Sequence, residues 1–140
     1  MNTEIKLLQF FFCKEFRQQK QDFFLAEGVQ TNFYVPRFPF YFRKFYAVTC
    51  WRKDHRFHKE VIEYNTDYGA SVRSPHMDIE PVKGSVIFRW HTHLFPSDFA
   101  IEKPTALTAH VFLDGKVVFE SYLLVEKFVG TLPPSEQFSK

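Results

Sequence analysis

The sequence predicts a single all-β domain, and three observations support this. Between Gly and Pro residues the chain runs in short alternating stretches rich in Phe, Tyr and Val, and none keeps a helical period. Hydrophobic residues make up 45% of the 140 residues, with 19 Phe, which is too apolar for a disordered chain and favours strands. The dipeptide Asp114-Gly115 between two such stretches is typical of a hairpin turn. We expect about seven to nine antiparallel strands, arranged as a sandwich or a barrel.

The candidate strands follow one another along most of the chain. They are expected at Ile5 to Cys13, Phe23 to Ala26, Thr31 to Val35, Phe42 to Trp51, Glu60 to Thr66, Ser85 to Phe95, Thr105 to Leu113 and Val117 to Glu126. The domain is therefore placed at residues 1–127. Residues 128–140 end in a stretch with two prolines and few apolar side chains, which predicts a frayed tail.

The clearest supersecondary signal is the hairpin around Asp114-Gly115, because both residues readily take the positive φ of a type I′ turn. On its second strand the apolar residues share one face and the acids Glu120 and Glu126 the other. The apolar set is Val117, Phe119, Leu123 and Val125. We expect one face of this strand to pack and the other to be solvated.

Two further connections are predicted from turn and charge patterns. The charged run Arg52 to Lys59 is expected to join the strands on either side of it as a second hairpin, and Pro81 to Gly84 to form a third turn. Long open sheet edges invite pairing with other chains. Since Thr105 to Leu113 carries no Asp, Glu, Lys or Arg, we expect the Asp-Gly hairpin to be central in its sheet or covered by a second copy.

Charge and cysteine content limit the partners and the compartment. A net charge of +2 gives little of the positive field that nucleic-acid binding needs. The N-terminal apolar run is too short for a membrane span and has no cleavage site for export. Cys13 and Cys50 lie in apolar stretches with the pattern of strands and are interpreted as buried free thiols. We expect a cytoplasmic protein that binds neither nucleic acid nor membrane.

The stretch Phe88 to Asp98 places His91 and His93 two residues apart, so both imidazoles lie on one strand face with Arg89. The His-Thr-His triplet resembles that of JAMM-type metalloproteases, but Leu94 stands where that family has proline, and Pro104 where it has a ligand aspartate. We interpret both histidines as solvent-facing. The alternative is a metal-dependent hydrolase in which His91 and His93 are completed by an acid from another strand.

A second set of metal-ligand types, Cys50, His55 and His58, lies within nine residues. Structural zinc normally takes four ligands, so these are interpreted as a buried thiol and two loop histidines. There is no Gly-rich phosphate loop and no nucleophile elbow. No cofactor is therefore predicted.

The segment Phe33 to Tyr46 combines eight Phe and Tyr residues with three basic ones. Most such residues in a strand pack in the core, but the mixture also suits a protein interface, stacking on single-stranded nucleic acid or a membrane surface. For a protein partner or a homodimer, the candidate binding residues are Arg37, Phe38, Phe40 and Phe42.

Three pieces of the chain resemble a family of small uncharacterised bacterial proteins. They are "LLQFFFCKEFR", "FFLAEGVQTNFYVPRFPFYF" and "ALTAHVFLDGKVVFESYLLVE". The resemblance implies a single β-sandwich of immunoglobulin-like architecture and implies no activity. The function expected from the sequence is a non-enzymatic binding or accessory module that engages a protein partner, with the metal-dependent hydrolase and a ligand-carrying β-barrel as rivals.

Overall fold

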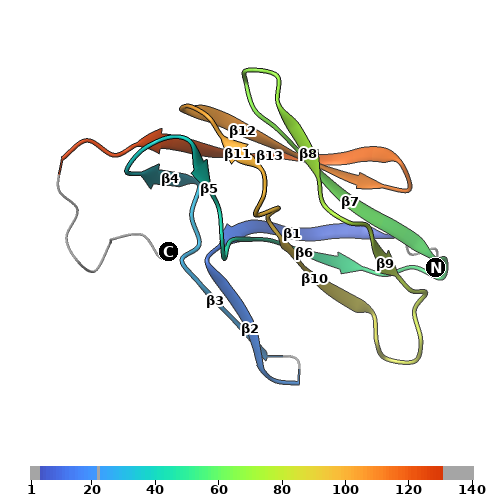
Figure 1. The fold of residues 1–140 in the computed structure, drawn as a ribbon. Helices are drawn as coiled ribbons and strands as arrows, with labels where there is room; N and C mark the ends of the chain where they lie inside the picture. Colours follow the sequence, from blue (N-terminus) through green and yellow to red (C-terminus); the bar gives the residue numbers. More distant parts are fainter. Residues whose placement is uncertain (1–3, 22, 131–140) are drawn as a thin grey trace.

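The computed structural model describes residues 4–21 and 23–130, and within these ranges the protein is all-β, as predicted (Figure 1). This part of the chain contains no helix long and apolar enough to cross a bilayer. The residues 131–140 of the expected tail lie outside it. Thirteen strands form in these ranges instead of seven to nine, because five short strands appear outside the expected ones, at Glu15–Lys20, Phe40–Tyr41, Ser71–Arg73, Met77–Ile79 and Ala100–Ile101.

The strands are, in chain order, β1 (Lys6–Cys13), β2 (Glu15–Lys20), β3 (Phe23–Glu27), β4 (Asn32–Val35), β5 (Phe40–Tyr41), β6 (Tyr46–Arg52), β7 (His58–Asn65), β8 (Ser71–Arg73), β9 (Met77–Ile79), β10 (Phe88–Leu94), β11 (Ala100–Ile101), β12 (Thr105–Leu113) and β13 (Lys116–Lys127).

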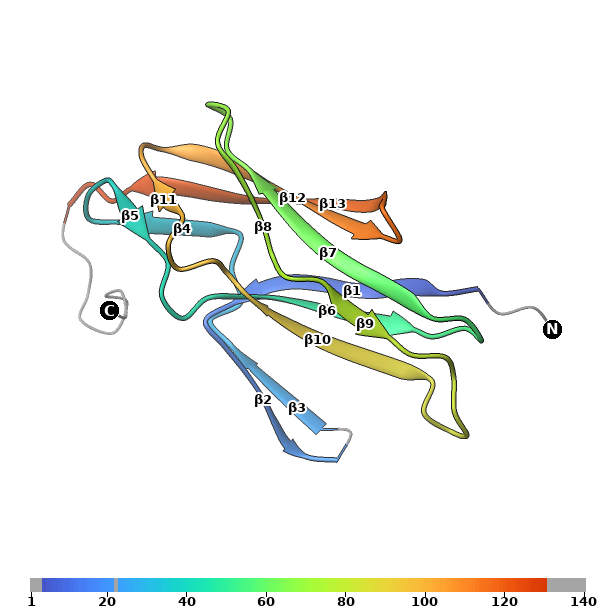
Figure 2. The ribbon, with the colours of Figure 1, turned by 45° about the vertical axis from the view of Figure 1, so that its right-hand side comes forward.

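Two larger sheets face each other across the core (Figures 1 and 2). The six-stranded sheet has the order β4-β13-β12-β7-β8, with β9 also paired to β7, and the three-stranded sheet has the order β1-β6-β10. Two small antiparallel pairs, β2-β3 and β5-β11, complete the fold. The pairing of β4 with β13 is parallel, so the larger sheet is mixed rather than purely antiparallel.

The Asp-Gly hairpin is confirmed as β12 and β13, with φ of 52° at Asp114 and 83° at Gly115. It is central in its sheet, because β12 also pairs with β7 and β13 with β4. The predicted apolar face of β13 is only partly correct. The register shifts where Val111 pairs with Phe119 but Phe112 pairs with Val117, and this bulge moves Val117 to the opposite face.

The predicted hairpin between the strands flanking Arg52 to Lys59 is wrong. Strand β6 lies in the three-stranded sheet and β7 in the six-stranded sheet, so the connection crosses between the two layers. Two of its charged side chains, Lys53 and Asp54, are buried by this crossing. The alternation of each strand was visible in the sequence, but alternation does not say which strand is the partner.

Strand β6 is buried on both faces from Ala47 to Trp51. Its inner face packs toward the large sheet, and the hairpin β2-β3 lies against its outer side. On that side the Phe16 ring stacks on Trp90 of the neighbouring strand β10, with centroids 5.5 Å apart. The two cysteines are buried and free, as predicted.

Candidate functional site

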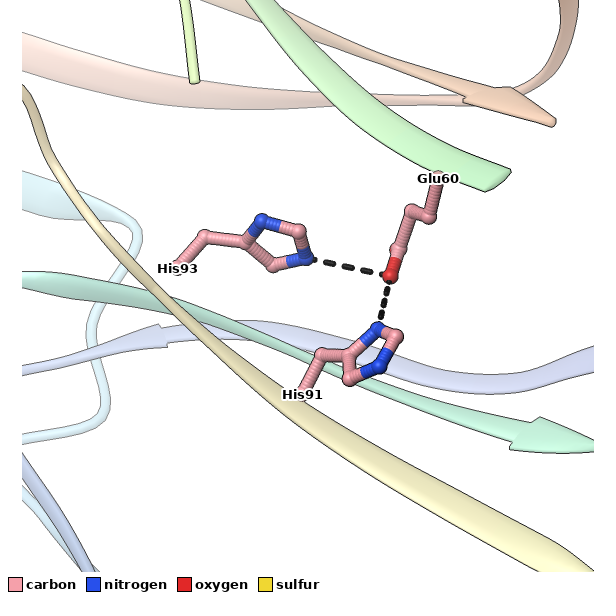
Figure 3. Close-up of side chains that lie close together, drawn as sticks. All are labelled: Glu60, His91 and His93. Atoms are coloured by element: carbon pink, nitrogen blue, oxygen red, sulfur yellow. Dashed lines mark hydrogen bonds and ion pairs between the residues drawn. The ribbon is translucent and has the colours of Figure 1, made fainter. Parts of the chain in front are cut away.

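A buried polar cluster lies between the two larger sheets, formed by Glu60 of β7, His91 and His93 of β10 and Thr49 of β6 (Figure 3). Alternate residues of a strand share a face, so Glu60 points inward with Ile62 and Tyr64. The pairing of β10 with β6 sets His91 beside Thr49. The cluster therefore joins three strands from both layers.

The interpretation of His91 and His93 as solvent-facing is wrong: their exposed fractions are 8% and 1%. The sequence correctly placed both histidines on one face with Arg89, but that face is turned toward the six-stranded sheet, where both histidines meet Glu60 of β7. Periodicity groups side chains by face, whereas the packing of the two layers decides which face is buried.

One carboxylate oxygen organises the cluster. Oε1 of Glu60 lies 2.6 Å from Nδ1 of His91 and accepts a hydrogen bond from the Thr49 hydroxyl at 3.1 Å. Nε2 of His93 lies 3.1 Å from the same oxygen, without the alignment of a hydrogen bond. Figure 3 shows both imidazole rings turned toward Glu60. Two nitrogens from one strand thus converge on one oxygen from the opposite sheet.

The charge of Glu60 is held by its neighbours. Burial raises the pKa of this carboxyl, but His91 and His93 more than offset the effect and bring it to about 2. Because an ionised carboxylate only accepts hydrogen bonds, Nδ1 of His91 carries the proton in this contact. Burial, and the Glu60 charge after it, raise the pKa of Tyr64 on the same strand face. The cluster is therefore an anionic oxygen between two imidazoles.

Several polar atoms on the same inner faces have no hydrogen-bond partner among residues 4–21 and 23–130. They are Oε2 of Glu60, Nδ1 and Nε2 of His93, the Tyr64 hydroxyl and Nε1 of Trp51. An unpaired buried polar group costs about 1–3 kcal/mol. The protein therefore carries unused donor and acceptor capacity at the point where its two sheets meet.

The three side chains have the composition of a metal site. One ligand atom from each of Glu60, His91 and His93 lies within 4.8 Å of the others, and no other group of three such side chains forms in the described part of the chain. Imidazole nitrogen and carboxylate oxygen bind zinc at about 2.0–2.2 Å. Two histidines and one carboxylate also form the iron(II) site of non-haem oxygenases.

A scan of protein-family models and searches of curated proteins and of solved structures find no match to this chain. The roles of these residues therefore rest on their geometry and chemistry.

The second set of metal-ligand types is not brought together. Cys50 is buried on β6, and His55 is exposed in the connection. His58 is the first residue of β7 rather than a loop residue, and its ring is buried between Asp54 and Asp114. Its Nε2 lies 2.8 Å from Asp54 and its Nδ1 2.6 Å from Asp114, so His58 ties the crossing connection to the Asp-Gly turn.

The predicted binding residues divide between surface and core. Arg37 is exposed, while Phe38 and Phe40 are half-buried against the core. Phe42 is 1% exposed and stacks on Phe45 with ring centroids 4.7 Å apart, so it is a core residue and cannot form a surface. A role for the other three in partner binding stays a prediction.

Sequence reasoning missed Glu60, although a signal for it was present. In the expected strand Glu60 to Thr66, the residues Glu60, Ile62 and Tyr64 fall on one face, and an acid on an otherwise apolar face is unusual. The same alternation predicts that such an acid is buried and needs a partner.

Proposed function

We propose that the protein binds one divalent transition-metal ion through Glu60, His91 and His93, and that the ion ties the two sheets of a non-enzymatic binding module together. The observation that supports this most is the convergence of three buried ligand side chains from opposite sheets. Only small movements are needed, because ligand atoms around zinc lie roughly 3.3 Å apart and two of the present separations are 2.6 and 3.1 Å.

The donor set favours zinc or iron(II) over calcium or magnesium, which prefer sites made of oxygen ligands. A metal ligand atom must be unprotonated, so Nδ1 of His91 has to lose the proton that it donates to Glu60, and affinity falls as the pH is lowered. The second oxygen of Glu60, or a water, completes the coordination. The Thr49 hydroxyl orients the carboxylate by its hydrogen bond.

A metal-dependent hydrolase using His91 and His93 is the second candidate. It is favoured by Glu60, which is the acid that the sequence hypothesis required from another strand. Three protein ligands are also typical of catalytic zinc, in which the fourth position holds the reacting water. The burial of all three side chains favours a structural ion, because substrate has little access except past His91.

The test is a titration of chelator-treated protein with Zn²⁺, followed by calorimetry and by thermal unfolding. We expect one ion per chain and a raised Tm, because an ion that binds only the folded state stabilises it. The variants His91→Gln and His93→Gln should lose this binding. The control is His76→Gln, which changes an exposed histidine in the same way.

Purified protein without stoichiometric metal, with no Tm change on adding Zn²⁺ or Fe²⁺, would contradict the proposal. Binding that survives in both β10 variants would place the metal elsewhere. The hydrolase candidate requires in addition that the metal-loaded protein cleaves a small activated ester such as p-nitrophenyl acetate and that His91→Gln does not.

A further inference from the structure

A groove lies at one end of the three-stranded sheet, between the hairpin β2-β3, the start of β10 and the segment Glu80 to Ile87. Its walls include Phe24, Phe88 and Trp90 and the basic side chains Lys53, Lys83 and Arg89. None of the three residues of the metal-site candidate lines it. The groove is therefore a separate feature of the surface.

Lys53 is the most informative residue of this groove. It is 3% exposed, and its ammonium makes no hydrogen bond or ion pair with any residue in the ranges 4–21 and 23–130. Only its backbone is bonded, through an N–H donated to the carbonyl of Ile87. A lysine is rarely buried unless it is paired. An unpaired ammonium at the end of an otherwise buried lysine, in the lining of a groove, is available to an anion.

A second cation in the groove points to the same ligand charge. Nε of Arg89 is buried and has no partner among the described residues, although a terminal nitrogen of the same guanidinium pairs with Glu80. Three basic side chains and a single acid, Glu80, line the groove, so its charge is positive on balance. This local balance favours an anionic ligand.

The remaining walls favour a flat apolar body. The rings of Phe24 and Trp90 lie 5.1 Å apart, and Trp90 also stacks on Phe16. Val86, Ile87 and Phe88 are exposed apolar residues that also line the groove. Apolar walls with a few placed polar groups are typical of small-molecule sites.

We propose that this groove binds a small organic carboxylate with a flat apolar body. Arg89 and Trp90 lie on opposite faces of β10, so the ligand lies across the edge of β10 that is turned away from β6, with its carboxylate on Lys53 and Arg89 and its body against Trp90 and Phe24. The charge is supplied by the Lys53 ammonium and by the Arg89 guanidinium, which Glu80 pairs at a terminal nitrogen only, and the aromatic walls supply the apolar contact. This site is independent of the metal at Glu60, His91 and His93.

The test compares three probes on the parent chain by calorimetry and tryptophan fluorescence. Naphthalene-2-carboxylate carries both features, naphthalene-2-carboxamide has the same body without charge, and acetate has the charge without the body. We expect saturable binding of the carboxylate, at least about tenfold weaker binding of the amide, and no binding of acetate, because a charge-assisted hydrogen bond is lost in the amide.

The variant Lys53→Met should weaken binding of the carboxylate by about tenfold or more and should raise Tm, because it removes an unpaired charge from a side chain that is 3% exposed. Lys44→Met, the same change at an exposed lysine outside the groove, should alter neither. Equal affinity for carboxylate and amide, undiminished binding by Lys53→Met, or no binding of any probe would overturn the proposal. If Lys53→Met does not fold, the comparison of carboxylate with amide on the parent chain decides.

Discussion

Replacing Asp114 by Asn should destabilise the protein in a pH-dependent way through His58. The carboxylate of Asp114 lies 2.6 Å from Nδ1 of His58 and accepts a hydrogen bond from the backbone N–H of Lys59. Asn-Gly suits a type I′ turn as well as Asp-Gly does, so the turn is kept. Asn can still accept from Lys59, and the change removes mainly the charge beside His58.

The loss of stability in Asp114→Asn depends on how far the Asp114 side chain is exposed to solvent. A hydrogen bond to a charged group is worth about 1.5–3 kcal/mol, and the half-exposed side chain of Asp114 reduces this by solvent screening. We expect a loss of about 1–1.5 kcal/mol, which for a chain of this size lowers Tm by roughly 3–6 °C.

The sign of the pH dependence is fixed by the directions of the pKa shifts. Burial lowers the pKa of His58, but hydrogen bonds to Asp114 and Asp54 more than offset this and raise it above its ordinary value. Burial raises the pKa of Asp114, and its bonds to His58 and to the Lys59 amide lower it on balance. The stability that protonated His58 contributes is fully present below about pH 6.5, and it is lost as the pH rises through the pKa of His58 in the folded protein. The stability that ionised Asp114 contributes is present above about pH 4, and it is lost as the pH falls through the pKa of Asp114 in the folded protein.

The assay is urea denaturation of the parent and Asp114→Asn at pH 5.5 and pH 9. The difference in free energy of unfolding should be largest at pH 5.5 and smaller at pH 9. Asp98→Asn, at an exposed aspartate, serves as the control and should show no such difference. An Asp114→Asn variant that is as stable as the parent at pH 5.5, or equally destabilised at both pH values, would refute the reasoning.

Three other outcomes are expected. Tyr64→Phe should be neutral or raise the free energy of unfolding by about 1 kcal/mol in urea denaturation, because the buried hydroxyl has no partner in the described part of the protein; a clear loss would show that it is satisfied. Gly115→Ala should lower Tm by several degrees, since its φ of 83° strains any side chain, and an unchanged Tm would contradict this. Cys13 and Cys50 should react slowly with a thiol reagent in native protein and quickly in urea, because burial raises the pKa of both thiols to about 11; equal rates would be the contrary result.

Local signals in the sequence were sufficient for the fold class and for the Asp-Gly hairpin, because the turn dipeptide and the alternation beside it act within a few residues. They were not sufficient to predict which strands pair with β6. Two adjacent strands joined by a polar run can pair or can cross between layers, and the choice depends on contacts between distant residues. The polar hairpin partner β2, "EFRQQK", was missed because its only aromatic residue is Phe16.

The site shows the same limit. Spacing alone placed His91 and His93 on one face, but no local pattern shows that this face meets Glu60 of another sheet. The prediction that Phe42 is a binding residue was wrong for a related reason. An aromatic run has the same sequence pattern whether its rings pack in the core or face a partner. Convergence of side chains in space requires the tertiary structure.

The parallel pairing of β4 with β13 has a consequence for how the chain folds during synthesis. Strand β4 lies in the first third of the chain, whereas β13 is the last strand described, and the backbone of Leu124 donates to the carbonyl of Thr31. Until β13 has left the ribosome, β4 has no strand to dock on in the six-stranded sheet. Contacts of such long sequence separation slow folding and leave early strands exposed. We expect β4 to remain unpaired and open to chaperones in the nascent chain until β13 has been synthesised.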